Sequence, residues 1–258
     1  MLDFIRIACA VPAVKPADVA KNAADICAYI EKADAQNVDL LLFPELSLTG
    51  YSCGDLFFQD SLLHAVKKGL GEIAFCSGKH PNVAVVVGFP LKIGTKLYNC
   101  AAMLTRGEVN GIVPKVHLDH NERRWFCSGK ELDDLFLQPE DIGLIHSEDF
   151  WDVPVQANTL FRLGDDAVVG IEICQDLMVP QPKSSALAVG GAEVILNLAA
   201  SHELAGKHHR RRSLVENQSA ACSCIYAFAS AGFTESTSDL VFSGYTVTSG
   251  CTRRGEKK

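Results

Sequence analysis

Hydrophobic residues recur along this chain in two patterns, short continuous runs and stripes with helical spacing. Continuous runs predict strands at 4–11, 38–43, 82–88, 194–198 and 225–229. Stripes predict helices at 16–33, 62–73 and 207–224, with a short helix at 184–189. This alternation of helices and buried strands is typical of an α/β fold.

Two further pairs of apolar runs predict β-hairpins. Strands at 97–104 and 112–113 flank a turn-rich segment at 106–111, and strands at 160–163 and 167–173 flank a Gly164-Asp165-Asp166 turn. Because hairpin strands are antiparallel, we expect mixed rather than purely parallel sheets. The segment 121–152 is polar and without a sustained period, so we expect an irregular excursion that lies over the functional site.

Length, charge and cysteine usage narrow the class of protein. At 258 residues the chain is long enough for one large core, and we expect a single domain over 1–258. The net charge of −7 argues against a nucleic-acid or membrane-surface role, and no apolar run approaches the roughly 20 residues of a membrane span. The ten cysteines lack the spacing of a zinc site. We therefore expect no metal, and reduced thiols in a cytoplasmic protein.

Cys174 is a candidate nucleophile because it follows the apolar run 167–173 directly. A thiol at a strand-to-helix elbow lies at the sheet edge beside unpaired backbone N–H groups. Those groups favour negative charge, so we expect them to lower the thiol pKa and to hold an oxyanion. Taken alone, however, a cysteine in this position fits a small buried hydrophobic residue better.

Glu45 and Lys115 also follow apolar runs that predict strands. Ligands of α/β sheets bind beyond the carboxyl ends of strands, so these two residues and Cys174 could converge there. A carboxylate can take the thiol proton, and an ammonium can polarise the carbonyl that the thiolate attacks. Each has a structural alternative: Glu45 could be a helix-start carboxylate, and Lys115 a solvated strand end.

Several separated motifs carry a family resemblance. F-P-E-L-S-L-T-G-Y at 43–51, V-P-K at 113–115 and G-I-E-I-C-Q-D-L at 170–177 resemble the nitrilase superfamily of C–N hydrolases, with its Glu-Lys-Cys triad. The segments 51–57, 201–212 and 235–244 are similar to the amino-terminal glutaminase domain of glutamine-dependent NAD⁺ synthetases. The resemblance covers nearly the whole chain.

The resemblance implies a four-layer αββα sandwich with two mixed sheets. It implies Glu45 as general base, Lys115 as stabiliser of the tetrahedral intermediate and Cys174 as nucleophile, with the Gln175 N–H in the oxyanion hole. L-Glutamine would be cleaved through a γ-glutamyl thioester to glutamate and ammonia, and this step needs no cofactor. The positions that match residues near the glutamine are Tyr51, Gln175, Ser201 and Lys207, and Glu122 is the candidate for a second supporting glutamate.

The chain departs from the family pattern in two places. The family has glutamate after the cysteine, and the neutral Gln175 should weaken capture of the substrate ammonium or alter which amide is preferred. The loop after Lys115 is also shorter, so that Glu122, Arg123 and Arg124 could instead form a solvated charged turn. In the basic cluster 207–212, the resemblance assigns Lys207 to the site, and we expect the other residues on the helix surface or in subunit contacts.

In the family an ATP-dependent synthetase domain follows, and its S-G-G-x-D-S motif is absent from this chain. We therefore expect a truncated piece of a longer enzyme that cannot make NAD⁺ by itself. ATP, Mg²⁺ and deamido-NAD⁺ would belong to the missing domain. The expected partners are L-glutamine, that synthetase domain and further copies of the chain in a homo-oligomer. Two alternatives stay open: a free-standing nitrilase-type amidase on another small amide, and a catalytically silent assembly scaffold.

Overall fold

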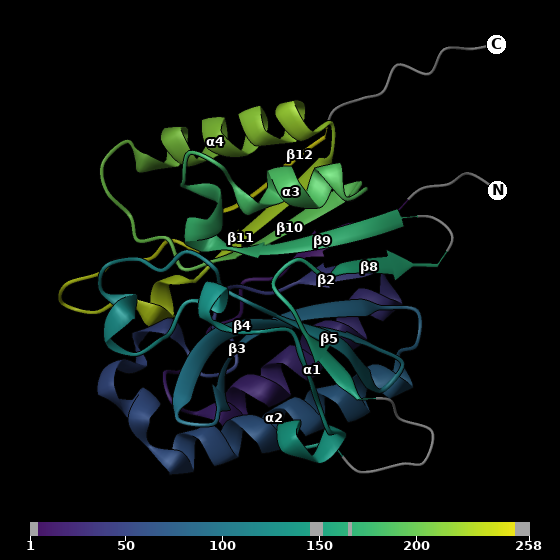
Figure 1. The fold of residues 1–258 in the computed structure, drawn as a ribbon, viewed down its shortest axis with the longest axis vertical. Helices are drawn as coiled ribbons and strands as arrows, with labels where there is room; N and C mark the ends of the chain where they lie inside the picture. The colour runs from purple at the N-terminus through teal and green to yellow at the C-terminus, as the bar shows by residue number, and fades with distance from the viewer. Residues whose placement is uncertain (1–4, 145–151, 165–166, 251–258) are drawn as a thin grey trace.

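A computed structural model describes residues 5–144, 152–164 and 167–250 of the chain. Two β-sheets are stacked face to face between two helix layers (Figure 1). Helices α1 (Val19–Ala35) and α2 (Asp60–Lys79) cover the outer face of the first sheet. Helices α3 (Lys183–Val189) and α4 (Lys207–Cys222) cover the second. This arrangement confirms the αββα sandwich that the family resemblance implied.

The first sheet has seven strands in the order β1-β2-β3-β4-β5-β7-β6. Strands β1 to β3 are parallel, and β3, β4 and β5 form an antiparallel meander. The strands are β1 (Ile7–Cys9), β2 (Leu40–Leu42), β3 (Ala84–Ile93), β4 (Lys96–Thr105), β5 (Glu108–Pro114), β6 (Leu135–Leu137) and β7 (Val153–Val155).

The second sheet has five strands in the order β12-β11-β10-β9-β8. Its three central strands are parallel, and the two edge strands are antiparallel to their neighbours. The strands are β8 (Leu160–Leu163), β9 (Ala167–Ile173), β10 (Val194–Ala199), β11 (Ile225–Ser230) and β12 (Thr246–Ser249). Both sheets are therefore mixed, as the two hairpins predicted.

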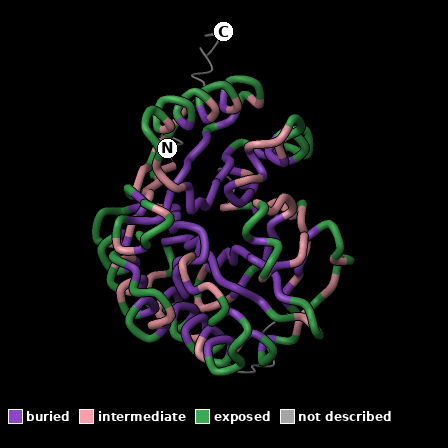
Figure 2. The backbone as a smooth tube through the Cα atoms, turned by 90° about the vertical axis from the view of Figure 1, so that its left-hand side faces the viewer, coloured by how far each residue is buried: buried purple, intermediate pink, exposed green. Residues whose placement is uncertain are grey.

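Alternation along the central strands divides the core between two faces. On β2, Leu41 and the following Phe43 join the cluster packed against α1 and α2, whereas Leu40 and Leu42 join the cluster between the sheets. All four side chains are at most 3% exposed, as expected for a run that is apolar at every position. Figure 2 shows the strands buried at the centre with exposed helices and loops around them.

Several expected boundaries differ from the structure. The strand expected at 4–11 is shorter, and the turn expected at 106–111 is tighter, because β4 and β5 already pair at Thr105 and Glu108. A bulge between Met103 and Leu104 absorbs the irregular spacing of that hairpin. The excursion at 121–152 contains the unexpected strand β6, and β7 and β12 were also not expected. Asp165, Asp166 and residues 145–151 lie outside the described residues.

Short 3₁₀ segments connect many of these elements, namely η1 (Tyr51–Phe58), η2 (Glu122–Arg124), η3 (Gly129–Glu131), η4 (Pro139–Ile142), η5 (Cys174–Leu177) and η6 (Phe233–Glu235).

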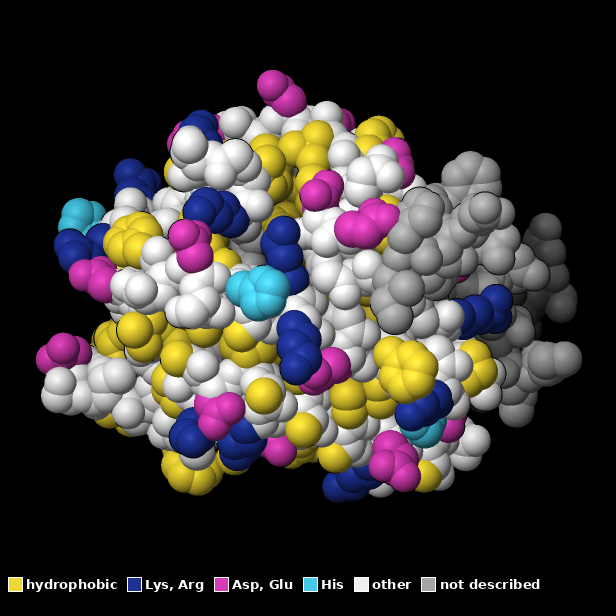
Figure 3. Space-filling model, turned by 90° about the horizontal axis from the view of Figure 1, so that it is seen from below, with side chains coloured by type: hydrophobic (Ala, Val, Ile, Leu, Met, Phe, Trp, Pro, Cys, Tyr) yellow, Lys and Arg dark blue, Asp and Glu magenta, His cyan; other side chains and the backbone are white. Residues whose placement is uncertain are grey.

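On the face formed by the α1/α2 layer, basic and acidic side chains are interspersed (Figure 3). Among the described residues, no helix combines the length and the hydropathy needed to cross a membrane.

Candidate active site

Strand ends from both sheets meet at one place in the molecule. Glu45 follows β2, Lys115 follows β5, and Cys174 follows β9. The backbone N–H of Glu45 donates to the carbonyl of Ala199 at the end of β10, at 3.3 Å, which joins the edges of the two sheets. The residues of the expected triad are 0%, 1% and 9% exposed, respectively. Neither the helix-start nor the solvated-strand-end alternative fits such burial.

The backbone around Glu45 is held by a close approach of β3. Leu46 has φ of +52°, a left-handed conformation, and so turns the chain sharply after the glutamate. Gly88 on β3 lies against this turn, where a Cβ atom would come 2.4 Å from the Leu46 nitrogen. Only glycine fits there, and this contact keeps Glu45 at the sheet edge.

Glu45 and Lys115 form a buried ion pair. The Lys115 Nζ lies 2.5 Å from Glu45 Oε1, and Asn99 Nδ2 donates to the same oxygen at 2.7 Å. Among the described residues, Glu45 Oε2 has no hydrogen-bond partner. Burial raises the pKa of Glu45 to about 8, although the Lys115 ammonium opposes that rise. The carboxyl therefore has a free oxygen and a pKa suited to taking and returning a proton near neutral pH.

Glu122 is the second carboxylate on this lysine. Its Oε1 lies 2.6 Å from the Lys115 Nζ, and its Oε2 accepts the Asp119 backbone N–H at 2.9 Å. Burial by itself lowers the pKa of Lys115, but the charges of Glu45 and Glu122 outweigh it and hold that pKa well above the usual value. Glu122 is 1% exposed, so the solvated-turn alternative is wrong for this residue and holds only for its exposed neighbours Arg123 and Arg124.

Cys174 occupies a strained elbow between β9 and η5. Its φ is +43°, which non-glycine residues rarely adopt, and its backbone N–H donates to Asn197 Oδ1 at 3.0 Å. Burial and the Glu45 carboxylate raise the pKa of the Cys174 thiol, although Lys115 and the Ala200 N–H oppose this. The expected lowering of the thiol pKa is therefore wrong for the resting site, because desolvation of the thiolate exceeds the stabilisation from these two donors. The charges of Glu45, Lys115 and Glu122 thus all act on the Cys174 sulfur.

Asp176, two residues after Cys174, ties the cysteine elbow to the lysine loop. Its carboxylate accepts the Ile173 N–H at 3.1 Å and the N–H groups of Val116 and His117 at 3.2 and 2.7 Å. Burial opposes ionisation, but the His117 ring and the Lys183 charge, together with these N–H donors, keep the pKa of Asp176 below its usual value. An ionised buried carboxylate thus connects the segments that carry Cys174 and Lys115.

Tyr51 and Lys207 reach this site from other elements. Burial raises the pKa of the Tyr51 hydroxyl, and the charges of Glu122, Glu45, Lys115 and Cys174 also act on it. Lys207 is the first residue of α4, where the positive end of the helix disfavours a cation. Burial lowers its pKa, and the Cys174 sulfur is the largest of the influences that raise it. The charges of the candidate triad thus act on Tyr51, and the Cys174 sulfur acts on Lys207, whereas the assignment of both residues to the substrate stays a prediction.

Ser201 is buried at 4% exposure, but its oxygen atoms already have a protein partner. Arg211 Nη1 donates to the Ser201 carbonyl at 3.2 Å and to its hydroxyl at 3.4 Å. Arg211 also pairs with Glu203 and lies over the Tyr245 ring at 4.8 Å. Because Arg211 is 2% exposed, its expected place on the helix surface is wrong: this residue supports the loop that carries Ser201.

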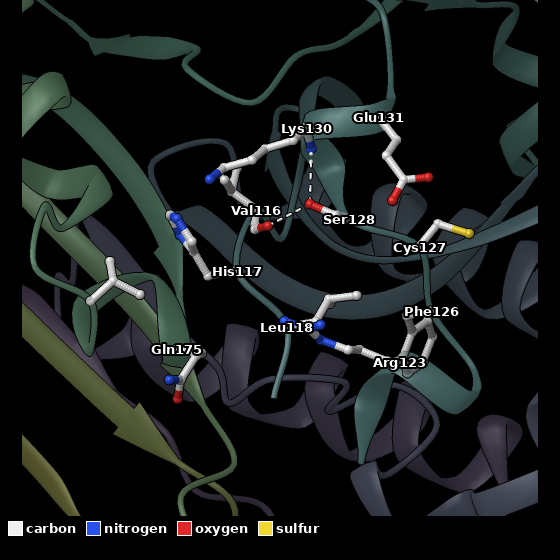
Figure 4. A pocket seen from close by; sticks show the side chains of 11 residues that line it. Val116, His117, Leu118, Arg123, Phe126, Cys127, Ser128, Lys130, Glu131 and Gln175 are labelled. Atoms are coloured by element: carbon white, nitrogen blue, oxygen red, sulfur yellow. Dashed lines mark hydrogen bonds between the residues drawn. The ribbon is translucent and has the colours of Figure 1, made fainter. Parts of the chain in front are cut away.

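Gln175 is half-buried and borders a cleft of about 600 Å³. Figure 4 shows Gln175 and His117 on one side of this cleft, facing Arg123 and the segment 126–131. Within the cleft, the Ser128 hydroxyl donates to the Val116 carbonyl at 2.6 Å. Gln175, at the position where the resemblance expects a glutamate, is therefore accessible from outside, directly after the buried Cys174.

The other cysteines do not form a metal site or a disulfide in the part of the chain that the structure describes. All nine cysteines in 5–144, 152–164 and 167–250 are free thiols. In the same ranges, no group of three or more His, Cys, Asp or Glu side chains could hold a metal ion.

A family model for carbon–nitrogen hydrolases matches residues 6–250. The chain belongs to the carbon–nitrogen hydrolase family. Glutamine-dependent NAD(+) synthetases from Mycobacterium tuberculosis and Mycobacterium leprae are 36% and 34% identical to this hydrolase over 250 residues, which is 95% of the chain. The chain spans about 35% of the length of these relatives.

Solved structures of two kinds share the fold of the hydrolase. A glutamine-dependent NAD(+) synthetase from Cytophaga hutchinsonii has a TM-score of 0.76 at 27% identity, covering 95% of this chain and 39% of the other. An amidase from Nesterenkonia sp. has a TM-score of 0.75 at 22% identity, covering 95% of this chain and 82% of the other. These matches confirm the nitrilase-like fold and the family resemblance seen in the motifs.

Buried polar residues on the strands of the hydrolase were not found by sequence reasoning. Glu172 on β9 and Asn197 on β10 pair in register and are 0% exposed. A polar residue inside a run that is apolar on both faces is the signal that could have found them. Arg211 is likewise spaced by four from the buried Val215 and Ser219 on α4, which places all three on the packed face.

Proposed function

We propose that this hydrolase is a glutamine amidohydrolase, which converts the side-chain amide of L-glutamine to glutamate and ammonia. The observation that carries the proposal is the buried contact between Glu45 and Lys115 beside the Cys174 sulfur. A carboxyl, an ammonium and a thiol are the groups that amide cleavage through a thioester requires. The names of the relatives, glutamine-dependent NAD(+) synthetases, support glutamine as the amide.

Glu45 acts as general base and Cys174 as nucleophile in this proposal. As the sulfur forms a bond to the amide carbon, the thiol proton moves to Glu45. The resulting oxyanion is stabilised by the Lys115 ammonium and by the backbone N–H of Gln175. Glu45 then returns the proton to the departing nitrogen, and ammonia leaves a γ-glutamyl thioester. A water molecule, deprotonated by Glu45, hydrolyses the thioester to glutamate and restores the thiol.

The side chains around the triad suit an amino-acid substrate. The half-buried ammonium of Lys207, near the sulfur and held at an unfavourable helix end, suits the substrate carboxylate. We assign Tyr51 to the wall near the triad, and Ser201, fixed by Arg211, to the loop that borders the substrate. Glu122 would act through Lys115 rather than on the substrate. Gln175 offers the α-ammonium an amide oxygen rather than a carboxylate.

The ammonia released would serve a synthetase domain outside the segment that this chain matches. We infer that this domain would use ATP and Mg²⁺ to amidate deamido-NAD⁺, and that the glutaminase step itself needs no cofactor. The domain and further copies of the chain in an oligomer are the proposed partners, and we expect activity to be slow without them, because a partner domain often completes the closed state of such a site.

A chloromethyl-ketone analogue of glutamine tests this proposal. Peptide mass spectrometry should find the analogue on Cys174, and excess L-glutamine should prevent that labelling. The half-buried thiols of Cys76 and Cys127 serve as internal controls for unspecific alkylation. If Cys174 is not labelled selectively, the proposal is wrong, and the chain acts as an assembly scaffold.

A free-standing amidase acting on another small amide is the second candidate, and the neutral Gln175 favours it. Without a carboxylate at this position, the site has less reason to select a substrate that carries an α-ammonium. The same labelling experiment separates the two candidates. Labelling of Cys174 that a simple amide such as propionamide prevents, and that L-glutamine does not, would support the amidase.

A further inference from the structure

The strained backbone at Cys174 requires a partner that holds it in place. A φ of +43° at a non-glycine residue is an unfavourable backbone conformation, whose cost the surrounding structure must offset. Two side chains, those of Asp176 and Asn197, accept hydrogen bonds from the backbone at this turn. Asp176 accepts the Ile173 N–H at 3.1 Å, and Asn197 accepts the Cys174 N–H at 3.0 Å.

Asn197 reaches the elbow from the neighbouring strand. It lies on β10 in register with Glu172 on β9, and it is 0% exposed. Its Nδ2 donates to Glu172 Oε1 at 3.2 Å and to the Tyr226 hydroxyl at 2.9 Å. Its Oδ1 accepts from Cys174. The side-chain amide therefore uses both of its ends.

This arrangement fixes which way the Asn197 amide points. A flipped amide would place Oδ1 against the Glu172 carboxylate and Nδ2 against the Cys174 N–H, so that two acceptors and two donors would face each other. Glu172 is itself held, because Tyr226 donates to its Oε1 and the Ser184 N–H donates to its Oε2 at 2.7 Å. These successive hydrogen bonds, from Ser184 to Glu172 and from Glu172 to Asn197, fix the orientation of Asn197 Oδ1. This oxygen therefore faces the backbone N–H of Cys174 as an acceptor.

We propose that Asn197 is a positioning residue for the nucleophile, which it holds through the Cys174 backbone N–H. This bond has two consequences. It keeps the left-handed turn that aims the sulfur toward the ion pair of Glu45 and Lys115. It also uses the Cys174 N–H, so that this group is not free to stabilise an oxyanion, which leaves that role to donors further along the turn. The inference deepens the proposed function, and its catalytic readout rests on that function.

The test compares Asn197→Leu, which removes the acceptor at similar volume, with Ser219→Ala as a matched control. Ser219 is equally buried on α4 and bonds the Cys224 carbonyl, away from the site. For Asn197→Leu we expect kcat for glutamine to fall about 100-fold, the cost of misplacing a reacting group by about 1 Å, with KM within about threefold of wild type. Ser219→Ala should lose stability without this loss of kcat.

Asn197→Asp supplies the rescue, because it keeps an acceptor for the Cys174 N–H while placing a second carboxyl beside Glu172. It should be the least stable variant and yet turn over faster than Asn197→Leu. A merely structural role predicts the opposite order, with activity following stability, and that order would overturn the inference. Should Asn197→Leu fail to fold, Tyr226→Phe takes its place, since it removes one of the two acceptors of Asn197 Nδ2. A kcat equal to wild type in that variant would equally contradict the inference.

Alkylation by iodoacetamide, followed at Cys174 by peptide mass spectrometry, separates this inference from the proposed function. The rate at Cys174 should fall at least about tenfold in Asn197→Leu, because the sulfur no longer faces Lys115, while Cys76 reacts at an unchanged rate. If Cys174 is alkylated faster in wild type than in Asn197→Leu, but wild type releases no ammonia from glutamine, the inference stands and the proposed function fails. If wild type hydrolyses glutamine and both proteins alkylate at equal rates, the inference alone fails.

Discussion

Glu45 and Lys115, which are 70 positions apart in the sequence, meet through a single carboxylate oxygen at 2.5 Å in the interior of the molecule. The other oxygen of Glu45 has no hydrogen-bond partner in the part of the chain that the structure describes, and the charges of both residues act on the Cys174 sulfur. The pair therefore holds the glutamate in place while one oxygen stays free for proton transfer.

Replacing the base should stop turnover and keep the fold. In Glu45→Gln the amide still offers an oxygen to Lys115, which also keeps its bond to Glu122, but it cannot take the thiol proton. We expect kcat to fall by about 10²–10⁴-fold, the usual contribution of a general base. Ammonia release measured with a coupled assay checks this, and thermal unfolding controls for loss of structure. A variant within about threefold of wild-type activity would remove Glu45 from the mechanism.

The pH dependence of kcat/KM should follow the ionisation of the Glu45 carboxyl. Burial raises the pKa of this carboxyl to about 8, and a general base acts only in its ionised form. Activity should therefore rise with pH on the acid side and level off above the pKa of Glu45. The measurement is kcat/KM for glutamine between pH 6 and pH 9 at constant ionic strength, in steps of about half a unit. A rate that is flat across this range would contradict the role of a base with a raised pKa.

Restoring the family's carboxylate should improve glutamine binding. In Gln175→Glu the substrate ammonium gains a charged acceptor on a half-buried side chain, worth about 1.4 kcal/mol, so that KM for glutamine should fall about tenfold with little change in kcat. Glutarate monoamide, which lacks the α-ammonium, is the matched substrate and should show no such gain. Equal gains for both substrates would mean that residue 175 does not contact the ammonium.

Glu235 should stabilise the segment that carries Tyr51. Its Oε2 accepts the N–H groups of Tyr51 and Ser52 at 2.7 and 3.2 Å and lies 3.1 Å from the Ser52 hydroxyl. Glu235→Ala removes the acceptor of the Tyr51 and Ser52 N–H groups, whereas the Ser52 hydroxyl keeps its bond to the backbone carbonyl of residue 235, and the variant should lower the free energy of unfolding by about 2–4 kcal/mol, as measured by urea denaturation. Glu235→Gln keeps an acceptor and should lose less than half as much. If the two variants lose equal amounts, the hydrogen bonds to Oε2 do not hold this segment.

The strand ends that carry the site could be predicted from the sequence, because the local pattern of apolar residues is enough to locate these strands. Runs that are apolar at every position indicate strands buried on both faces, and such strands end abruptly at Glu45 and Cys174. The same pattern predicted Lys115 at a strand end, and the family resemblance added what no local pattern contains, that Glu122 joins the same cluster. The expected direction of the Cys174 pKa was wrong, because the N–H groups of a turn are visible in sequence whereas the depth of burial is not.

Elements whose stability comes from distant neighbours were missed. The edge strand β6 and its neighbour β7 are three residues each; β7 pairs with β5 and β6, and β6 pairs with β7. Arg211 was expected on the surface because it belongs to a basic cluster, but tertiary contacts with Ser201, Glu203 and Tyr245 bury it. Local charge density could not reveal which member of that cluster faces inward.

Ammonia release from L-glutamine by the Cys174→Ala variant tests the central claim most directly. The substitution removes the sulfur alone, and a small side chain at the same buried position should leave the fold and the contact between Glu45 and Lys115 intact, which circular dichroism and thermal unfolding can verify. The account predicts that wild type releases ammonia and that the folded variant releases none above the uncatalysed background. Ammonia release by the variant at a rate close to wild type would contradict it.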